Sequence, residues 1–162
     1  MYHIGYVNAN SLPDGKFAQA VCLFEKLFDF LFIAEHWYQH HNARLAHPPI
    51  FCSTTLPLST NNTLPRGRKH GGIYLLVRPH LRSLIQSTTS SQYSITVSLP
   101  GFRFAAVYYP PYSLSEQNLK TNLNKIGPVD LLLGDINTKF QSNSGPKMNI
   151  SSSTTRIRAI LF

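Results

Sequence analysis

The sequence predicts a mixed α/β (α+β) fold in a single domain that covers all 162 residues. Three observations predict it: a strand–helix–strand unit opens the chain, two apolar strands form a hairpin near its middle, and a second helix leads into a last apolar strand. Hydrophobic residues make up 43% of the chain. That share is typical of a folded domain and excludes the class of disordered chains.

The first strand is predicted at residues 3–8, and a dense turn that runs to Gly15 follows it. Phe17, Val21 and Phe24 then recur at helical spacing, so an amphipathic helix is expected. Asp14 stands just before this pattern, where an aspartate can cap a helix.

The second strand is the continuous apolar run at residues 30–34, which is typical of a strand buried on both faces. A strand–helix–strand unit normally crosses over into a parallel pair, so Asn8 and Glu35, which close the two strands, are expected at the same sheet edge. Ligands bind at such edges in α/β folds. Taken alone, Glu35 also fits a surface carboxylate just beyond a strand.

A polar stretch at residues 38–64 predicts a long surface loop. A basic cluster of Arg66, Arg68 and Lys69 follows and precedes a strong strand at residues 71–78. The cluster fits a solvated charged loop and a phosphate-contacting loop equally well.

Two more strands are predicted at residues 94–99 and 102–108, joined as a hairpin by a Pro-Gly turn. Tyr109 closes the second of them. Ser113 and Glu116 then fit a capping box that opens a helix.

The last predicted strand is the apolar run at residues 131–133, which stops at Gly134. Side chains alternate along a strand, so Asp135 and Asn137 point the same way. A carboxylate and an amide on the rim of a sheet can hold a phosphate, a water or a metal. Gly, Asp and Asn are also the usual turn formers, so the motif alone fits a plain turn as well.

Charge favours a polyanionic partner. Fifteen Lys and Arg stand against seven Asp and Glu, which gives a net charge of +8. Nucleic acid is the first candidate for such a partner, although an ordinary basic protein has the same balance.

The two cysteines, Cys22 and Cys52, form no C-x-x-C pair, so no zinc site is predicted. Cys22 falls within the apolar helical pattern and is expected in the core. No apolar run approaches the length of about 18 residues that a membrane helix needs, and no signal-peptide layout is present. We therefore expect an intracellular protein that does not act on a membrane.

Five short signatures, taken in chain order, resemble the endonuclease/exonuclease/phosphatase superfamily. The resemblance is strongest to the endonuclease domains of LINE-type (non-LTR) retrotransposons. The signatures are NANSL, FIAEHW, GGIYLLV, VYYPP and LGDIN, at residues 8–12, 32–37, 71–77, 107–111 and 133–137.

The resemblance implies a two-sheet β-sandwich flanked by helices, and hydrolysis of a DNA phosphodiester with Mg²⁺ or Mn²⁺. It implies that Glu35 is the main metal ligand, with Asn8 beside it. Asp135 would orient or deprotonate the attacking water, and Asn137 and Tyr109 would hold the scissile phosphate. This agrees with the preference of magnesium for one or two carboxylates and several waters.

The candidate nucleic-acid contacts are Asn10 and the basic cluster of Arg66, Arg68 and Lys69. If the chain belongs to a retroelement, the resemblance implies that the protein is located in the nucleus.

One departure from the family is serious. The family carries a Ser-Asp-His motif in its final strands, and its histidine is central to catalysis, but this sequence contains no Ser-Asp-His. We therefore expect a truncated or degenerate domain with the C-terminal part of the fold missing and with weak or absent nuclease activity. Two alternatives stay open: a non-catalytic basic fragment that binds nucleic acid, and a phosphatase of the same superfamily.

Overall fold

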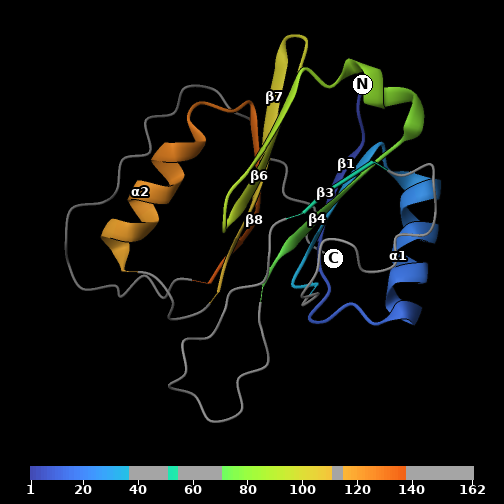
Figure 1. Cartoon of the computed structure of the whole chain (residues 1–162), viewed down its shortest axis with the longest axis horizontal. Helices are drawn as coiled ribbons and strands as arrows, with labels where there is room; N and C mark the ends of the chain where they lie inside the picture. The colour runs from blue at the N-terminus through green and yellow to red at the C-terminus, as the bar shows by residue number, and fades with distance from the viewer. Residues whose placement is uncertain (37–50, 55–70, 111–114, 138–162) are drawn as a thin grey trace.

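The computed structural model describes residues 1–36, 51–54, 71–110 and 115–137. Two four-stranded sheets pack face to face, with α1 on the outer side of one and α2 on the outer side of the other (Figure 1). The predicted two-sheet sandwich flanked by helices is therefore confirmed. The prediction that the C-terminal part is missing concerns residues after 137, which lie outside the described residues. None of the helices in the described part is long and apolar enough to cross a membrane.

The elements follow one another as strand, helix and strand, then a run of strands, then helix and strand. In chain order they are β1 (Ile4–Asn8), α1 (Asp14–Leu27), β2 (Phe30–Ala34), β3 (Phe51–Thr54), β4 (Ile73–Val77), the 3-10 helix η1 (Pro79–Leu84), β5 (Ser87–Ser90), β6 (Ser94–Leu99), β7 (Phe102–Tyr109), α2 (Glu116–Ile126) and β8 (Leu131–Ile136).

Each sheet contains one parallel pair. The first sheet has the order β1-β2-β4-β3 and the second has the order β5-β6-β7-β8. β1 and β2 are parallel with Asn8 opposite Ala34, and β7 and β8 are parallel with Tyr108 opposite Asp135. Helices α1 and α2 make the two crossovers that parallel pairs require. As a result, Asn8 at the end of β1 and Glu35 just after β2 lie at the same edge of the first sheet, as the sequence predicted, and Asp135 lies near the carboxyl end of β8.

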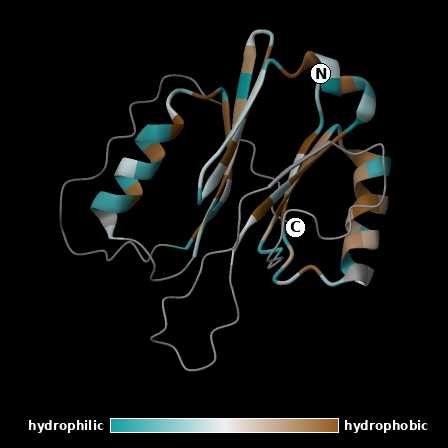
Figure 2. Ribbon diagram, viewed as in Figure 1, coloured by the Kyte–Doolittle hydropathy of each residue, from teal (hydrophilic) through white to brown (hydrophobic). Residues whose placement is uncertain are grey.

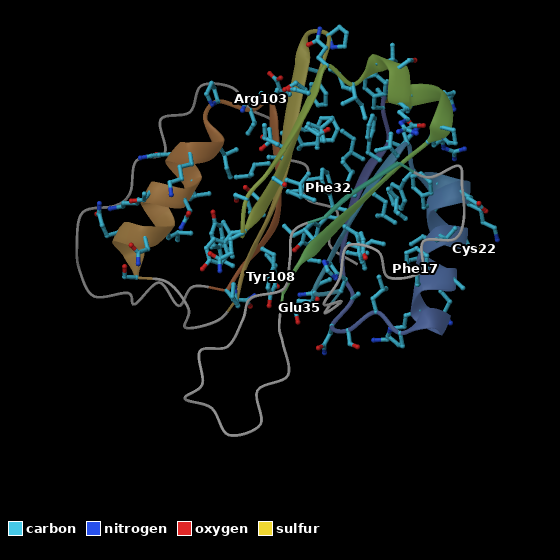
Figure 3. The ribbon with its side chains drawn as sticks, in the orientation of Figure 1. Phe17, Cys22, Phe32, Glu35, Arg103 and Tyr108 are labelled. Carbon is cyan, nitrogen blue, oxygen red and sulfur yellow. The ribbon has the colours of Figure 1, made fainter. Side chains whose placement is uncertain are left out.

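Three apolar layers hold the sandwich together. The inner layer lies between the sheets, where Phe30 and Phe32 of the first sheet meet Phe104 of the second edge-on, at ring-centroid distances of 5.0 Å and 5.9 Å. Figure 3 shows Phe32 between the two sheets. The other two layers lie beneath α1 and α2. Figure 2 shows the strands of the first sheet largely in the hydrophobic colour and α2 largely in the hydrophilic one. β2 is buried on both faces, as its continuous apolar run predicted.

Both predicted helix caps are wrong. The N-cap residue of α1 is Pro13, and Asp14 is already the first helical residue. The N-cap residue of α2 is Ser115, whose Oγ accepts a hydrogen bond from the Asn118 N–H at 3.3 Å. Ser113, the cap that the sequence predicted, lies outside the described residues. A shift of two residues is enough to move the cap, since one Ser-rich stretch offers several acceptors.

Cys22 is exposed and is not part of the core, which corrects the prediction made from the helical pattern. The buried side of α1 is set by Phe17, Val21 and Phe24. Two residues along a helix correspond to about 200° of rotation, so Cys22 lies almost opposite Phe24. The side chain of Cys52, in β3, lies outside the described residues.

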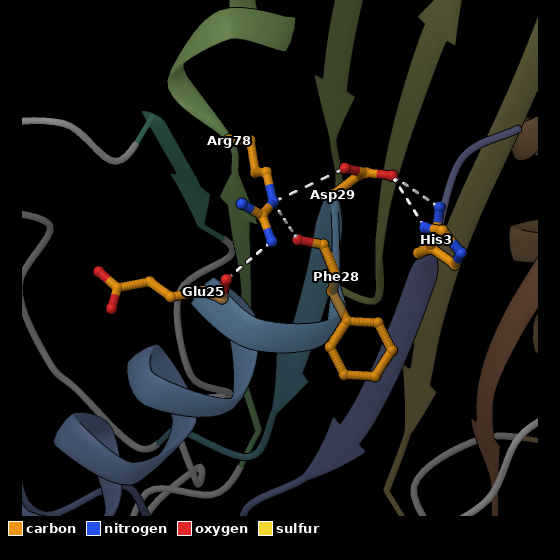
Figure 4. Close-up of polar contacts among 5 residues, drawn as sticks. All are labelled: His3, Glu25, Phe28, Asp29 and Arg78. Carbon is orange, nitrogen blue, oxygen red and sulfur yellow. Dashed lines mark hydrogen bonds and ion pairs between the residues drawn. The ribbon is translucent and has the colours of Figure 1, made fainter.

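An arginine clamps the C-terminal end of α1 to the first sheet (Figure 4). Arg78 Nε donates to the Phe28 carbonyl and Nη2 donates to the Glu25 carbonyl, both at 2.8 Å. Asp29 Oδ1 lies 3.6 Å from the same Nε, while Asp29 Oδ2 accepts from the His3 N–H at 2.8 Å. This clamp fixes where β1 and β2 begin, and therefore where their carboxyl ends lie.

A second arginine does the same for α2 and the second sheet. Arg103 donates from Nη2 to the Ile126 carbonyl at 2.8 Å and from Nη1 to the Pro128 carbonyl at 2.9 Å. Its backbone N–H donates to Asp130 Oδ2 at 2.7 Å, and the Asp130 N–H returns a bond to the Arg103 carbonyl at 2.7 Å. The start of β8 is thereby fixed against the start of β7.

Candidate active site

Three of the predicted residues meet at one end of the sandwich. Asn8 ends β1, Glu35 follows β2, and Asp135 lies near the end of β8. Asn8 Nδ2 donates to Glu35 Oε1 at 2.7 Å and to Asp135 Oδ2 at 3.3 Å. Because both oxygens lie within 3.3 Å of one nitrogen, they are at most about 6 Å apart. The cluster joins the two sheets across 127 residues of sequence.

The backbone that presents this cluster is unusual. Glu35, Asn10 and Ser11 all have positive φ, at 56°, 44° and 80°. The conformation at Glu35 is held on both sides, because its N–H donates to the Gly72 carbonyl at 2.9 Å and its carbonyl accepts from the Ser11 N–H at 2.8 Å. A left-handed residue with a side chain costs on the order of 1–3 kcal/mol and persists where the surroundings impose it, often at functional sites.

Gly72 is required at its position for two reasons. Its φ is +83°, and a Cβ there would overlap the His36 imidazole ring. That ring is 2% exposed and lies 4.2 Å from the Tyr74 ring, centroid to centroid. The second glycine of the Gly-Gly signature therefore lets β4 approach the chain at Glu35, and its carbonyl holds the Glu35 backbone.

Gly134 lies within β8, between its apolar residues and Asp135. The sequence predicted that the strand stops there, but β8 continues through Gly134 to Ile136. Its φ is +148°, and a Cβ would overlap the Val107 carbonyl of β7. Glycine is needed because the two strands pass so closely, and the continued strand brings Asp135 to the cluster.

The sequence analysis missed Tyr108. It lies opposite Asp135 in the register of β7 and β8, it is buried, and its hydroxyl hydrogen-bonds the Glu35 side chain. Burial is the main cause that raises the pKa of Tyr108, and the hydrogen bond and the negative charge of Glu35 raise it further. Tyr108 is therefore a neutral hydrogen-bond donor at ordinary pH. Figure 3 shows Tyr108 and Glu35 at the same end of the two sheets.

Tyr6 was missed as well. It lies two residues before Asn8 in β1, it belongs to the inner apolar layer, and its hydroxyl is buried. Burial, followed by the negative charge of Asp135, raises the pKa of Tyr6. The period of two along a strand is the signal that could have found Tyr6, because it places residues 6 and 8 on one face.

The structure does not bring Tyr109 to the cluster, contrary to the prediction. Its ring is 1% exposed and packs beneath α2 with Leu119 and Ile126, 5.3 Å from the Tyr93 ring. Burial raises the pKa of Tyr109 to about 12. Neighbouring residues of a strand face opposite sides, so only one of Tyr108 and Tyr109 can face Asp135.

The remaining predicted residues lie at the border of the cluster or beyond the described part. Asn137 directly follows β8, and its N–H donates to the Tyr109 carbonyl at 3.3 Å. Asn10 is exposed, and its N–H donates to Asn8 Oδ1 at 3.0 Å. The predicted basic cluster at residues 66–69 lies outside the described residues.

The donor set fits Mg²⁺ or Mn²⁺. Glu35 and Asp135 supply hard oxygen ligands, and such cations are often held by one or two carboxylates with water and phosphate completing the shell. Two nearby carboxylates repel each other, and a bound cation relieves that repulsion. Asn8 directs its side-chain nitrogen to both carboxylates, and its Oδ1 accepts a hydrogen bond from the Asn10 N–H. No group of three or more His, Cys, Asp and Glu with metal-site geometry occurs in the described ranges.

Solved structures with a similar fold were found by comparison. The chain matches the 3′ phosphatase NExo from Neisseria, in a structure bound to a product DNA hairpin, with a TM-score of 0.59 and 18% identity. This match covers 85% of the chain but 58% of NExo, so the chain spans little more than half the length of that protein. At this level of identity the match shows a shared fold.

Two further matches are weaker. The 3′-5′ exonuclease NExo from Neisseria meningitidis has a TM-score of 0.47 and 18% identity, over 75% of this chain and 47% of that one. The human Nocturnin catalytic domain, with a bound sulfate anion, has a TM-score of 0.45 and 11% identity, over 76% and 55%. No family model and no curated protein sequence matches the chain.

Proposed function

We propose that this chain carries a site for divalent-cation-dependent hydrolysis of a phosphodiester in DNA. The observation that carries the proposal is the Asn8 amide, which draws the Glu35 and Asp135 carboxylates of two different sheets together. Two carboxylates in reach of one cation are what phosphoryl chemistry with Mg²⁺ needs.

Each residue has a distinct role in this proposal. Glu35 and Asp135 would hold Mg²⁺ or Mn²⁺, and the bound cation would supply polarisation of a phosphoryl oxygen and stabilisation of the leaving oxygen. The Asp135 carboxylate also orients the attacking water and accepts its proton. Asn8 keeps the two carboxylates in place, and the Asn137 amide donates to the scissile phosphate.

The finer proposal is a DNA endonuclease of the LINE retroelement type, working in the nucleus. The five ordered signatures support it, and so does the net charge of +8. We expect slow turnover from these 162 residues, since the family's catalytic histidine has no Ser-Asp-His counterpart in the sequence.

Two other functions each have one observation in their favour. A 3′ phosphatase is favoured by the fold shared with NExo, which is named for that activity. A non-catalytic nucleic-acid-binding fragment is favoured by the net positive charge.

One experiment separates the three. The purified chain is incubated with Mg²⁺ or EDTA and two substrates: supercoiled plasmid, and a duplex oligonucleotide with a 3′ phosphate. Slow nicking that needs Mg²⁺ and disappears in Glu35→Ala supports the endonuclease. Release of phosphate without nicking supports the phosphatase.

The matched control is Glu25→Ala, which removes an exposed carboxylate from α1 and makes the same change in charge. It should hydrolyse DNA as the wild-type chain does. Salt-sensitive binding without hydrolysis of either substrate would contradict the proposed hydrolysis and favour the binding fragment.

A further inference from the structure

One edge of the second sheet is formed by β5. This strand pairs with β6 on one side, and no strand of the described ranges lies on its other side. It is short, with the sequence STTS, and Ser87, Thr89 and Ser90 are exposed. Such an edge presents backbone N–H and C=O groups with which a further strand can pair.

The hydrogen bonds to β6 show which backbone groups of β5 face outward. Just after the strand, the Ser91 N–H donates to the Ser94 carbonyl at 2.8 Å, which continues the β5–β6 register. Hydrogen-bonded and non-hydrogen-bonded pairs alternate along an antiparallel ladder, so the backbone groups of Thr89 also point towards β6. The N–H and C=O groups of Thr88 and Ser90 therefore point away from β6, towards the outer edge.

Charge does not oppose contact between two copies of the chain at this edge. The net charge is +8, so like charge separates two copies wherever basic residues face each other. Residues 83–102, which contain β5, β6 and their connection, include no Asp, Glu, Lys, Arg or His. Proteins commonly protect an edge strand with charged residues or proline, and β5 has neither.

The geometry of β5 suits pairing with its own counterpart. A two-fold axis normal to the sheet makes the two strands antiparallel and keeps equivalent faces on the same side. With the axis between the two Thr89 residues, Thr88 lies opposite the partner's Ser90, and these two residues exchange their outward backbone hydrogen bonds. Thr89 then lies directly opposite the partner's Thr89. Opposed Ser and Thr side chains are a favourable cross-strand combination.

We propose that β5 is a self-association edge, through which two copies of this chain form a dimer with one continuous sheet and with Thr89 at the two-fold axis. Because β5 has only four residues, few hydrogen bonds form, and the dimer is weak and depends on protein concentration. β5 and β8 are opposite edges of the second sheet, so the pairing does not use the carboxylate cluster. The inference does not depend on the proposed function.

The first test is disulfide capture at the axis. Opposed residues of a non-hydrogen-bonded antiparallel pair have Cα atoms about 4.5 Å apart, a distance that a disulfide can span. Thr89→Cys is prepared in a chain in which Cys22 and Cys52 are replaced by serine, and it is oxidised with glutathione disulfide. The matched control is Ser91→Cys, in the same hairpin, because the proposed pairing holds the two copies of residue 91 about 14 Å apart.

We expect Thr89→Cys to form a disulfide dimer, of twice the 18.3 kDa mass of the chain, at least about tenfold faster than Ser91→Cys does. Non-reducing electrophoresis over time measures both rates. Equal rates would overturn the proposal, since they would show only random collisions between exposed thiols.

The second test needs no added cysteine. Sedimentation equilibrium compares the wild-type chain with Thr89→Lys, which places two positive charges opposite each other at the axis, and with Thr89→Gln, an uncharged control. Thr89→Lys should weaken the dimer by about tenfold or more, and Thr89→Gln should retain it. Thr89 is exposed, so circular dichroism should show the same fold in all three. A wild-type chain that stays at 18.3 kDa up to about 1 mM would overturn the proposal, as would a dimer that Thr89→Lys leaves unchanged.

Discussion

At the scale of single residues, the cluster depends on positions where the backbone leaves ordinary conformations. Glu35 has a φ of 56°, and Gly72, whose carbonyl holds the Glu35 N–H, has a φ of 83°. Residues at positive φ rarely persist without support, and here hydrogen bonds from two neighbouring segments supply it. The position of the Glu35 carboxylate is therefore decided by its backbone before its side chain makes any contact.

Gly72→Ala should destabilise the chain by about 2 kcal/mol or more, because it adds strain at positive φ and forces a Cβ into the buried His36 ring. Urea unfolding followed by circular dichroism measures the change. Gly15→Ala is the control: a Cβ there meets nothing within 4 Å, and alanine favours the helix by up to about 1 kcal/mol. Equal stability of the two variants would contradict this account.

Buried tyrosines should make stability depend on alkaline pH. Tyr109 has its pKa raised from 10.0 to about 12, so the unfolded chain loses this proton at lower pH than the folded chain does. The stabilisation is complete below pH 10 and is lost as the pH rises through about 12. Urea midpoints measured across this range should fall less steeply in Tyr109→Phe than in the wild-type chain. An identical fall would contradict the burial of this hydroxyl.

The sequence was enough to predict that Asn8, Glu35 and Asp135 lie at or near the ends of strands, because apolar runs mark where strands end. The sequence did not show that Tyr109 faces away from Asp135. That orientation depends on which face of β7 lies opposite Asp135, and that is set by the pairing register with β8.

At the scale of elements, the two strand–helix–strand units are built alike. Each has parallel strands joined by a helix, and each helix ends in carbonyls held by an arginine, Arg78 for α1 and Arg103 for α2. An aspartate precedes the second strand of each unit, and the strand then leads to an acidic residue at the site. The contacts of Arg78 and Arg103 fix where β2 and β8 begin. They therefore also determine the positions of Glu35 and Asp135 at the other ends of these strands.

Arg78→Ala should cost about 1–3 kcal/mol of unfolding free energy, because it leaves the Phe28 and Glu25 carbonyls without the Arg78 donor and removes the ion pair with Asp29. Thermal or urea unfolding measures the loss. Lys26→Ala, an exposed cation in the last turn of α1, should change stability by less than about 0.5 kcal/mol. Similar losses in both variants would show that the clamp does not act as described.

Long apolar runs predicted β2 and β4, because strands buried on both faces need such residues throughout. β3 and β5 were not predicted. They are four-residue edge strands with the sequences FCST and STTS, and they take their conformation from pairing with β4 and β6, not from their own composition.

At the scale of the whole molecule, the site exists only because the two sheets close on each other. Asn8 and Asp135 come from different sheets and from opposite ends of the described chain. The strands that carry Asn8, Glu35 and Asp135 end at the same edge of the sandwich, so these side chains meet there. The inner apolar layer fixes the spacing between the sheets. Sequence alone could place residues at strand ends, but the contact between the sheets needed the three-dimensional arrangement.

The basic character of the chain should show in DNA binding. Replacing Arg66, Arg68 and Lys69 together by alanine should lower affinity and reduce the slope of log affinity against log salt by about 3, which corresponds to three lost phosphate contacts. Fluorescence anisotropy with a labelled duplex at several salt concentrations measures the slope. An unchanged slope would show that these residues form a solvated loop.

The central claim is that Glu35 and Asp135 together hold one divalent cation at the junction of the two sheets. The most direct measurement is a crystal structure of the chain soaked in Mn²⁺, with anomalous scattering used to locate the metal. The account predicts one strong anomalous peak within ligand distance of both carboxylates, and its loss in Glu35→Ala. A Mn²⁺ peak elsewhere on the chain, with the space between Glu35 and Asp135 free of metal, would contradict the account.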